Sequence, residues 1–171
     1  HYVPVLASRM GGKDSLAPWL DRLFAAGSDL IGRHQVDITG LIGQYAHGNE
    51  PSHHMAYLYN YTNAPEKTQL YVDQILNELY TIQPDGLSGN EDCGQMSAWY
   101  VMSALGLYPI APGNTNYQIG RPLFKKAEIK LPNRKKLSIQ APNNSGSAKY
   151  VKEVSFNKTK VNDTEIDHNQ I

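Results

Sequence analysis

The stretch GNEDCGQM, residues 89–96, repeats much of an earlier stretch, GNEPSHHM, residues 48–55. Both open on Gly-Asn-Glu, and both place a methionine five residues after the glutamate. The offset, 89 − 48 = 41 residues, lies in the range of helix-pair repeats and is too long for a single helix with its turn. The spacing therefore predicts two helices, one repeat apart, whose acidic entry loops lie at the same end of a helical array.

Local signals support a helix after each copy. Pro51 suits the first turn of a helix over residues 51–62, a segment rich in tyrosine. After the second copy, Asp92 and Gln95 have the spacing of a capping box, and Gly106 ends the apolar pattern. Both acidic loops are thus expected to lead directly into helices.

Apolar periodicity predicts two further helices. One covers residues 12–26 and is closed by Gly27, and the other begins at Asn63 and ends before Pro84. The residues that carry the two patterns are Leu16, Trp19, Leu20 and Leu23, followed by Val72, Ile75, Leu76 and Leu79. Residues 36–46 are apolar but interrupted by glycine, so a loop or a short helix is expected there.

The pattern changes after Gly106. Proline and glycine punctuate the next segment, and three short runs beyond it predict strands: Ala127–Leu131, Leu137–Ala141 and Val151–Phe156. Helices therefore come first and strands last. We expect a mainly α fold, with a helical part over residues 1–112 and a short antiparallel β segment over residues 113–171.

Charge is unevenly distributed along the chain, although the formal net charge is zero. Residues 1–120 hold 5 Lys and Arg against 11 Asp and Glu, and residues 121–171 hold 11 against 5, which gives −6 and +6. A basic segment can bind nucleic acid, but KKAEIKLPNRKKLSIQAP, residues 125–142, alternates apolar and charged residues as a solvated strand pair does. We therefore expect no nucleic-acid partner.

Composition restricts the class of protein further. A chain of 171 residues with 40% apolar content fits one domain or a large part of one. The single cysteine, Cys93, excludes an internal disulfide, and its place at a helix start favours packing over nucleophilic chemistry. No apolar run is long enough to span a membrane, and no signal peptide is visible. Because the chain starts at His1, we expect a processed or excised piece.

The first acidic loop gathers residue types found in zinc sites: His47, Glu50, His53 and His54. Pro51 breaks the helical register that would hold them on one face, and their order does not match the helical zinc-protease motif. The two loops also contain oxygen donors of the kind that calcium takes from irregular loops: Asn49, Glu50, Asn90, Glu91 and Asp92.

Each of these residues also has an ordinary structural role. Asn and Asp before a helix usually cap it, and a histidine at a helix start is commonly packed or solvated. Two matching acidic loops nevertheless favour a shared cation or substrate site. Capping keeps Asp92 ionised, and the ionised form is the one that a metal ligand or a general base requires.

Two long motifs resemble the C-terminal catalytic region of glycoside hydrolase family 92. They are HGNEPSHHMAYLYNYTNAPEKTQ, residues 47–69, and DGLSGNEDCGQMSAWYVMSALGLYP, residues 85–109. The likeness extends to GRPLFKKAEIKL, residues 120–131, and to the IDHNQI end, residues 166–171. The family consists of calcium-dependent, exo-acting α-mannosidases that are abundant in gut bacteria. The resemblance implies an (α/α)6 toroid followed by returning strands, and hydrolysis of mannosides with inversion.

The resemblance also implies roles for single residues. Asn49, Glu50 and Asp92 match the calcium-site motif. Asp92 also matches the general base, and Asn90 lies where other members carry a second, assisting acid. The three histidines of the first motif are carried over as substrate-pocket residues: His47, His53 and His54.

The remaining expectations concern context. The general acid belongs on a segment upstream of the position matched by HYVPV, so we expect a C-terminal fragment of the enzyme that is inactive alone. Uncovered apolar faces at Trp19, Leu23 and residues 51–62 lead us to expect self-association. The family implies mannose-containing glycans such as N-glycans as substrates, and a bacterial periplasmic or extracellular location. A calcium-dependent carbohydrate-binding module and a purely structural helical fragment remain alternatives.

Overall fold

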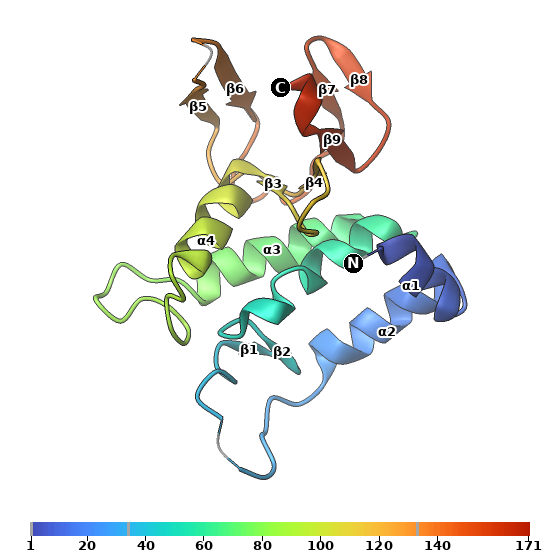
Figure 1. Ribbon diagram of the computed structural model, residues 1–171, viewed down its shortest axis with the longest axis vertical. Coiled ribbons are helices and arrows are strands. Elements are labelled where there is room, and N and C mark those ends of the chain that lie inside the picture. Colours follow the sequence, from blue (N-terminus) through green and yellow to red (C-terminus); the bar gives the residue numbers. More distant parts are fainter. Residues whose placement is uncertain (1, 34, 133) are drawn as a thin grey trace.

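Helices occupy the first two thirds of the chain and most strands occupy the last third (Figure 1). The computed structural model describes residues 2–33, 35–132 and 134–171. Its helices are α1 (Val3–Arg9), α2 (Lys13–Ala25), η1 (Glu50–Ser52), η2 (Met55–Tyr61), α3 (Glu66–Glu78), α4 (Gln95–Leu105) and η3 (His168–Gln170), where η marks 3-10 helices. Its strands are β1 (Leu41–Ile42), β2 (Tyr45–Ala46), β3 (Leu107–Tyr108), β4 (Asn116–Ile119), β5 (Lys126–Lys130), β6 (Lys136–Gln140), β7 (Val154–Phe156), β8 (Thr159–Val161) and β9 (Glu165–Asp167).

The prediction of a mainly α fold, part of an (α/α)6 toroid, is wrong: the chain is mixed α and β. The described strands form four small antiparallel sheets, ordered β1-β2, β3-β4-β9, β5-β6 and β7-β8. One sheet, β1-β2, lies within the segment that was expected to be helical. The three predicted strands are confirmed as β5, β6 and β7, with ends shifted by at most three residues.

The helix predicted over residues 51–62 is the clearest local error. The segment forms two 3-10 helices, η1 and η2, and no α-helix. Five consecutive residues of η2 are buried, Ala56 to Asn60, so the segment faces core on every side and has no amphipathic period. Its apolar richness therefore reflected a buried connection. The other three predicted helices are present as α2, α3 and α4.

The core is built around η2. This segment packs against α3, α2 and α1, and the β4 strand reaches it from the other side. Buried aromatic rings line the contact, among them Tyr45, Tyr57, Tyr59 and Trp99. Phe24 of α2 stacks on Tyr71 of α3 with ring centroids 4.0 Å apart. The helices thus form a rigid base under the two acidic loops.

A buried arginine joins this base to the hairpins. Arg121 is 8% exposed and forms an ion pair with Asp73 of α3. Its guanidinium also donates to Asn144 Oδ1 at 2.9 Å and to the Ser145 carbonyl at 3.0 Å. In turn, the Asn144 amide donates to two backbone carbonyls in the segment that enters β5. The β5-β6 hairpin is therefore fixed at its base to α3.

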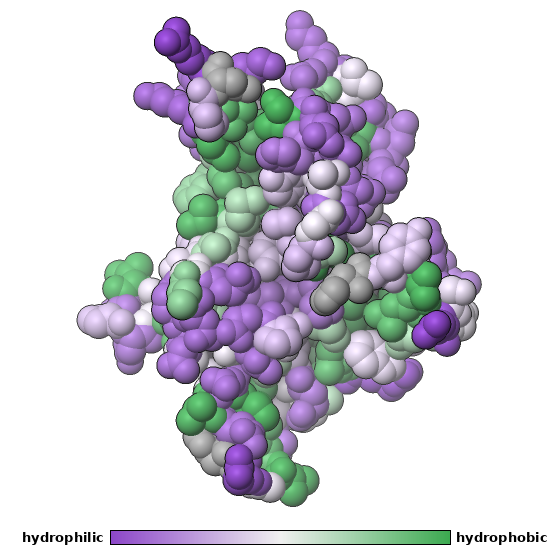
Figure 2. Space-filling view, in the orientation of Figure 1, coloured by the Kyte–Doolittle hydropathy of each residue, from purple (hydrophilic) through white to green (hydrophobic). Residues whose placement is uncertain are grey.

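Apolar side chains are exposed over α1 and α2 and along the loop that follows α2 (Figure 2). They include Tyr2, Val5, Leu6, Trp19, Leu30, Ile31 and Val36. Leu23 is half-buried, and most of η2 is buried, so the uncovered face is smaller than the sequence suggested. Among the described residues, no helix combines the length and the hydropathy that crossing a membrane requires.

Candidate functional site

The two Gly-Asn-Glu loops lie against one another, as their matched placement predicted. Gly89 contacts Gly48 so closely that a Cβ atom on Gly89 would lie 2.9 Å from the Gly48 carbonyl oxygen. A Cβ atom on Gly48 would lie 2.1 Å from Oγ1 of Thr39. Neither position has room for a side chain, and Gly89 also has φ +76, a conformation that glycine adopts without strain. The shared glycines are the point at which the loops meet.

This contact brings two carboxylates together. The side chains of Glu50 and Asp92 are in hydrogen-bond contact, and this bond, with a smaller effect of burial and of the Glu50 charge, raises the pKa of Asp92. Two carboxylates that share one proton repel one another once both are ionised. Within the described part of the chain, no cationic side chain forms an ion pair with these two acids.

An unusual turn presents Asp92 at the surface. Asp92, Cys93 and Gly94 have φ values of 50, 55 and 94, so three successive residues adopt the left-handed conformation. This region is costly for residues other than glycine and persists only where neighbouring contacts hold it. The turn exposes both Asp92 and the Cys93 thiol, so the packing role predicted for Cys93 is wrong.

The predicted capping box is also wrong, because α4 starts two residues later than that motif requires. Gly94 is the N-cap, and neither Asp92 nor Gln95 makes a capping bond. Glu91 caps the helix instead: one carboxylate oxygen accepts from the Ser97 amide at 3.2 Å and the other from Ser97 Oγ at 3.1 Å. Glu91 is thereby occupied, and the Asp92 carboxylate takes no part in capping.

The two asparagines flank the carboxylate pair in the chain. Asn49 is half-buried, and its backbone carbonyl accepts from the Ser52 amide at 2.9 Å, while its side chain makes no capping bond to η1. Asn90 is exposed. Both side-chain amides therefore lie beside the acids without being used in helix capping. Their predicted roles, as metal ligand and as assisting group, stay predictions.

The histidines of the first loop lie in a different environment. His47 and His53 are 0% and 2% exposed, and their rings stack with centroids 4.7 Å apart. The His47 ring is bonded to Tyr45 through Nδ1 at 2.8 Å and to Tyr80 through Nε2 at 2.6 Å. His53 is bonded to the His47 carbonyl through Nε2 at 3.0 Å and to Gln95 through Nδ1 at 3.1 Å. Protein groups thus occupy all four ring nitrogens.

The acceptors in this network decide the tautomers. The Tyr80 hydroxyl donates to the Met96 carbonyl, so its oxygen accepts from His47 Nε2, and Nδ1 of that ring accepts from Tyr45. A backbone carbonyl can only accept, so His53 also carries its proton on Nε2. Both rings are neutral with an unprotonated Nδ1. They support the loops from beneath, and their predicted contact with substrate stays a prediction.

His54 differs from these two because it is only half-buried. Burial lowers its pKa, and a hydrogen bond to the Pro51 carbonyl acts in the opposite direction. Of the three histidines carried over as substrate-pocket residues, it is the one with ring surface open to a ligand.

The buried histidines predict acid lability of the metal-free chain. Burial, and to a lesser extent the neighbouring His53, lowers the pKa of His47 from 6.5 to about 3. Below pH 6.5 the His47 side chain of the unfolded chain binds a proton, whereas the native ring stays neutral. The contribution of His47 to the free energy of unfolding is therefore complete above pH 6.5 and is lost as the pH falls toward 3. We expect a loss of about 2 kcal/mol between pH 7 and pH 5.

Urea unfolding at both pH values, with a chelator present, measures this loss. His47→Gln should flatten the dependence on pH, whereas His168→Gln, at an exposed site, should leave it as in the unmodified chain. If His47→Gln lost as much stability between pH 7 and pH 5 as the unmodified chain does, other groups would be the cause of the acid lability.

Sequence reasoning missed Gln95, Trp99 and Tyr80 as parts of the site. Trp99 is fully buried, and its indole donates to the His53 carbonyl at 3.0 Å. Its ring lies edge-on to His47 with centroids 4.5 Å apart. One signal was available: Gln95 and Trp99 follow the second acidic loop at helical spacing on one face of α4.

The acidic pair suits a hard cation in ligand chemistry and only partly in ligand number. Carboxylate and amide oxygens are the donors that calcium prefers, and it takes six to eight of them. Within the described residues, no three His, Cys, Asp or Glu side chains gather into a metal-binding group. The predicted ligands Glu50, Asp92 and Asn49 would supply only part of a coordination shell, and backbone carbonyls, water or groups outside this chain would have to complete it.

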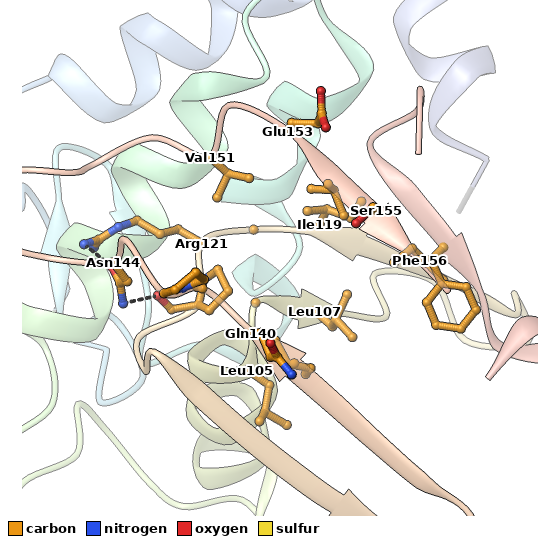
Figure 3. A pocket seen from close by; sticks show the side chains of 18 of the residues that line it. Leu105, Leu107, Ile119, Arg121, Gln140, Asn144, Val151, Glu153, Ser155 and Phe156 are labelled. Atoms are coloured by element: carbon orange, nitrogen blue, oxygen red, sulfur yellow. Dashed lines mark hydrogen bonds between the residues drawn. The ribbon is translucent and has the colours of Figure 1, made fainter. Parts of the chain in front are cut away.

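A well-formed hollow lies elsewhere, between the β5-β6 and β7-β8 hairpins (Figure 3). It has a volume of about 500 Å³. Leu105, Leu107 and Ile119 form part of its apolar wall, and Arg121 and Asn144 close one end. None of its lining residues belongs to the acidic loops. Volume alone would therefore have pointed away from the carboxylate pair.

Comparison with known families gives a match over the whole chain. The family model described as the glycosyl hydrolase family 92 catalytic domain matches residues 1–171. A protein of Arthroderma benhamiae described as an uncharacterized secreted glycosidase is 29% identical over 136 residues, which are 77% of this chain and 15% of that protein.

Solved structures agree with this match. A family GH92 α-mannosidase from Bacteroides thetaiotaomicron is 42% identical, with a TM-score of 0.83 over 94% of this chain and 21% of its own. A family GH92 inverting mannosidase from the same organism is 34% identical, with a TM-score of 0.83 over 100% of this chain and 24% of its own. The chain thus spans between a fifth and a quarter of the length of these solved relatives.

Proposed function

This chain belongs to glycosyl hydrolase family 92, and on that premise we propose that it supplies the general base and the cation-binding half of an inverting α-mannosidase site. The observation that carries the proposal is the meeting of the two Gly-Asn-Glu loops, which places the Glu50 and Asp92 carboxylates in contact. A relative of 34% identity is described as an inverting mannosidase, which supports the stereochemical part.

Inversion requires two groups on opposite faces of the sugar. A carboxylic acid protonates the leaving oxygen, and a carboxylate about 6.5–9.5 Å away activates a water molecule. We assign the carboxylate to Asp92, because the left-handed turn exposes it and Glu91 performs the capping. In this assignment Asn90 orients the water.

Calcium is the cation that the family implies. Glu50, Asp92 and Asn49 would hold it, since their oxygens match its preference and, in the ranges that the structure describes, neither carboxylate forms an ion pair. When bound, the ion supplies positive charge that orients sugar hydroxyls and favours the distorted ring of the transition state. Glu50 thus binds the cation, and Asp92 both contributes to that binding and accepts the proton of the water.

Substrate and location follow from the relatives. The solved relatives are α-mannosidases, so we propose terminal α-linked mannose of glycans such as N-glycans as the substrate. We assign the contact with this mannose to His54, because His47 and His53 are enclosed and His54 is half-buried. The Arthroderma benhamiae relative is described as secreted, which supports an extracellular place of action.

Mannose release tests this proposal in a full-length family 92 enzyme that carries this sequence. Proton NMR of an aryl α-mannoside digest should show β-mannose first, before mutarotation, which is the mark of inversion. A chelator should abolish the release, and added calcium should restore it. Initial formation of α-mannose, or unchanged activity in the chelator, would overturn the assignment.

A further inference from the structure

Gln95 links the two acidic loops through hydrogen bonds. Its side-chain amide nitrogen lies 3.1 Å from Nδ1 of His53 and donates to the Tyr108 hydroxyl at 3.2 Å. His53 belongs to the first loop, and Gln95 immediately follows the left-handed turn of the second. The bond therefore crosses between the two copies of the repeat, and Gln95 is half-buried.

The polarity of this bond is fixed by its neighbours. His53 donates its only proton to the His47 carbonyl, which leaves Nδ1 as an acceptor. Burial lowers the pKa of His53, so its ring stays neutral. Only a donor can satisfy Nδ1, and the amide of glutamine is a donor whereas an ionised glutamate is not. The requirement at position 95 is thus for hydrogen-bond polarity as well as for size.

The turn between Asp92 and Gln95 needs such a link. Its two left-handed residues other than glycine, Asp92 and Cys93, store strain, and few backbone bonds close it. Those bonds run from the Gln95 amide to the Asp92 carbonyl at 3.2 Å and from the Met96 amide to the Glu91 carbonyl at 3.3 Å. Both are long for such bonds. A side-chain contact just beyond the turn therefore has a strong influence on where Asp92 points.

We infer that Gln95 is a positioning residue, which locks the second acidic loop onto the first and holds Asp92 toward Glu50. This inference rests on the proposed function, because it takes that pair as the cation site. Gln95 acts through His53 and touches neither substrate nor cation. Groups that orient metal ligands in this way typically change metal affinity by about 10-fold to 100-fold when they are replaced.

Gln95→Met tests the inference, since methionine keeps the length of the side chain and removes both hydrogen bonds. In the metal-free chain, the amides of residues 95–97 report whether the turn is closed, because their acceptors lie in residues 91 and 92. We expect their hydrogen exchange to accelerate about tenfold, with no change in α3. Gln95→Glu should behave alike, because its carboxylate faces an acceptor. Gln74→Met on α3 is the matched control.

Calcium affinity gives the second readout. In the full-length enzyme, Gln95→Met should weaken calcium binding by about 10-fold to 100-fold while the melting temperature stays close to that of the unmodified protein. Unchanged exchange at residues 95–97 would overturn the role of Gln95, whatever calcium does. If exchange accelerates in Gln95→Met but the unmodified protein binds no calcium, the positioning role of Gln95 is supported and the proposed cation site is overturned.

Discussion

Asp92→Asn in a full-length family 92 enzyme carrying this sequence is expected to lower the turnover number by about 10² to 10⁴-fold. The amide keeps the size of the side chain but cannot accept a proton from the attacking water. The left-handed turn should tolerate asparagine, which adopts this conformation readily. Removal of the negative charge also ends the repulsion with Glu50, so the fold should persist. Steady-state kinetics at saturating calcium measures the loss.

Glu50→Gln is the matched comparison, since it makes the same chemical change in the other carboxylate. It should weaken calcium binding and raise KM more than it lowers the turnover number, because Glu50 is assigned to the cation and not to the water. Excess calcium should recover part of the Glu50→Gln activity and almost none of the Asp92→Asn activity. Near-normal turnover in Asp92→Asn would return Asp92 to a purely structural role in the turn.

The contact between the acidic loops could be predicted because each copy of the repeat opens on a glycine, a residue type that marks positions without room for a side chain. Gly48 and Gly89 have no room for a side chain, so the positions that make the loops touch are the glycines that open each motif. The repeated Gly-Asn-Glu unit can be recognised from the sequence alone. The pairing of Glu50 with Asp92 follows from this contact, since each stands at a short distance from its glycine in the chain.

The supporting layer could not be predicted in the same way. Whether a histidine binds a ligand or supports the fold depends on the groups that surround its ring. One of the two hydrogen-bond partners of the His47 ring, Tyr80, lies far away in the chain. The prediction of an α-helix over residues 51–62 was wrong for a related reason. An apolar run that is buried on all sides has no period, so its local geometry is decided by tertiary packing.

Capping was misjudged because three acids or amides compete at the start of α4. Glu91, Asp92 and Gln95 all have suitable chemistry, and sequence spacing favours the pair Asp92 and Gln95. The left-handed turn changes this order, since it moves the helix start to Gln95 and leaves Glu91 within reach of the Ser97 amide. Backbone conformations of this kind are rare for aspartate and cysteine, so no local pattern announces them.

The second large effect is expected at Trp99, which contacts the two buried histidines of the first loop. Its side chain is fully buried, contacts the ring of His47 and donates to the His53 carbonyl. Trp99→Ala removes this ring and leaves a cavity and an unpaired carbonyl, which together should cost about 4 kcal/mol. A loss of this size is a large share of the 5–15 kcal/mol that stabilises a typical domain.

Trp19→Ala provides the control for Trp99→Ala, because Trp19 is the other tryptophan of the chain and is 37% exposed on α2. Urea unfolding followed by circular dichroism should show a much smaller loss for this variant, since part of its ring already contacts water. Phenylalanine at position 99 should restore part of the packing without the indole bond, so Trp99→Phe should fall between Trp99→Ala and the unmodified chain. Equal losses of unfolding free energy in Trp99→Ala and Trp19→Ala would mean that the buried Trp99 ring stabilises the fold no more than the partly exposed Trp19 ring does.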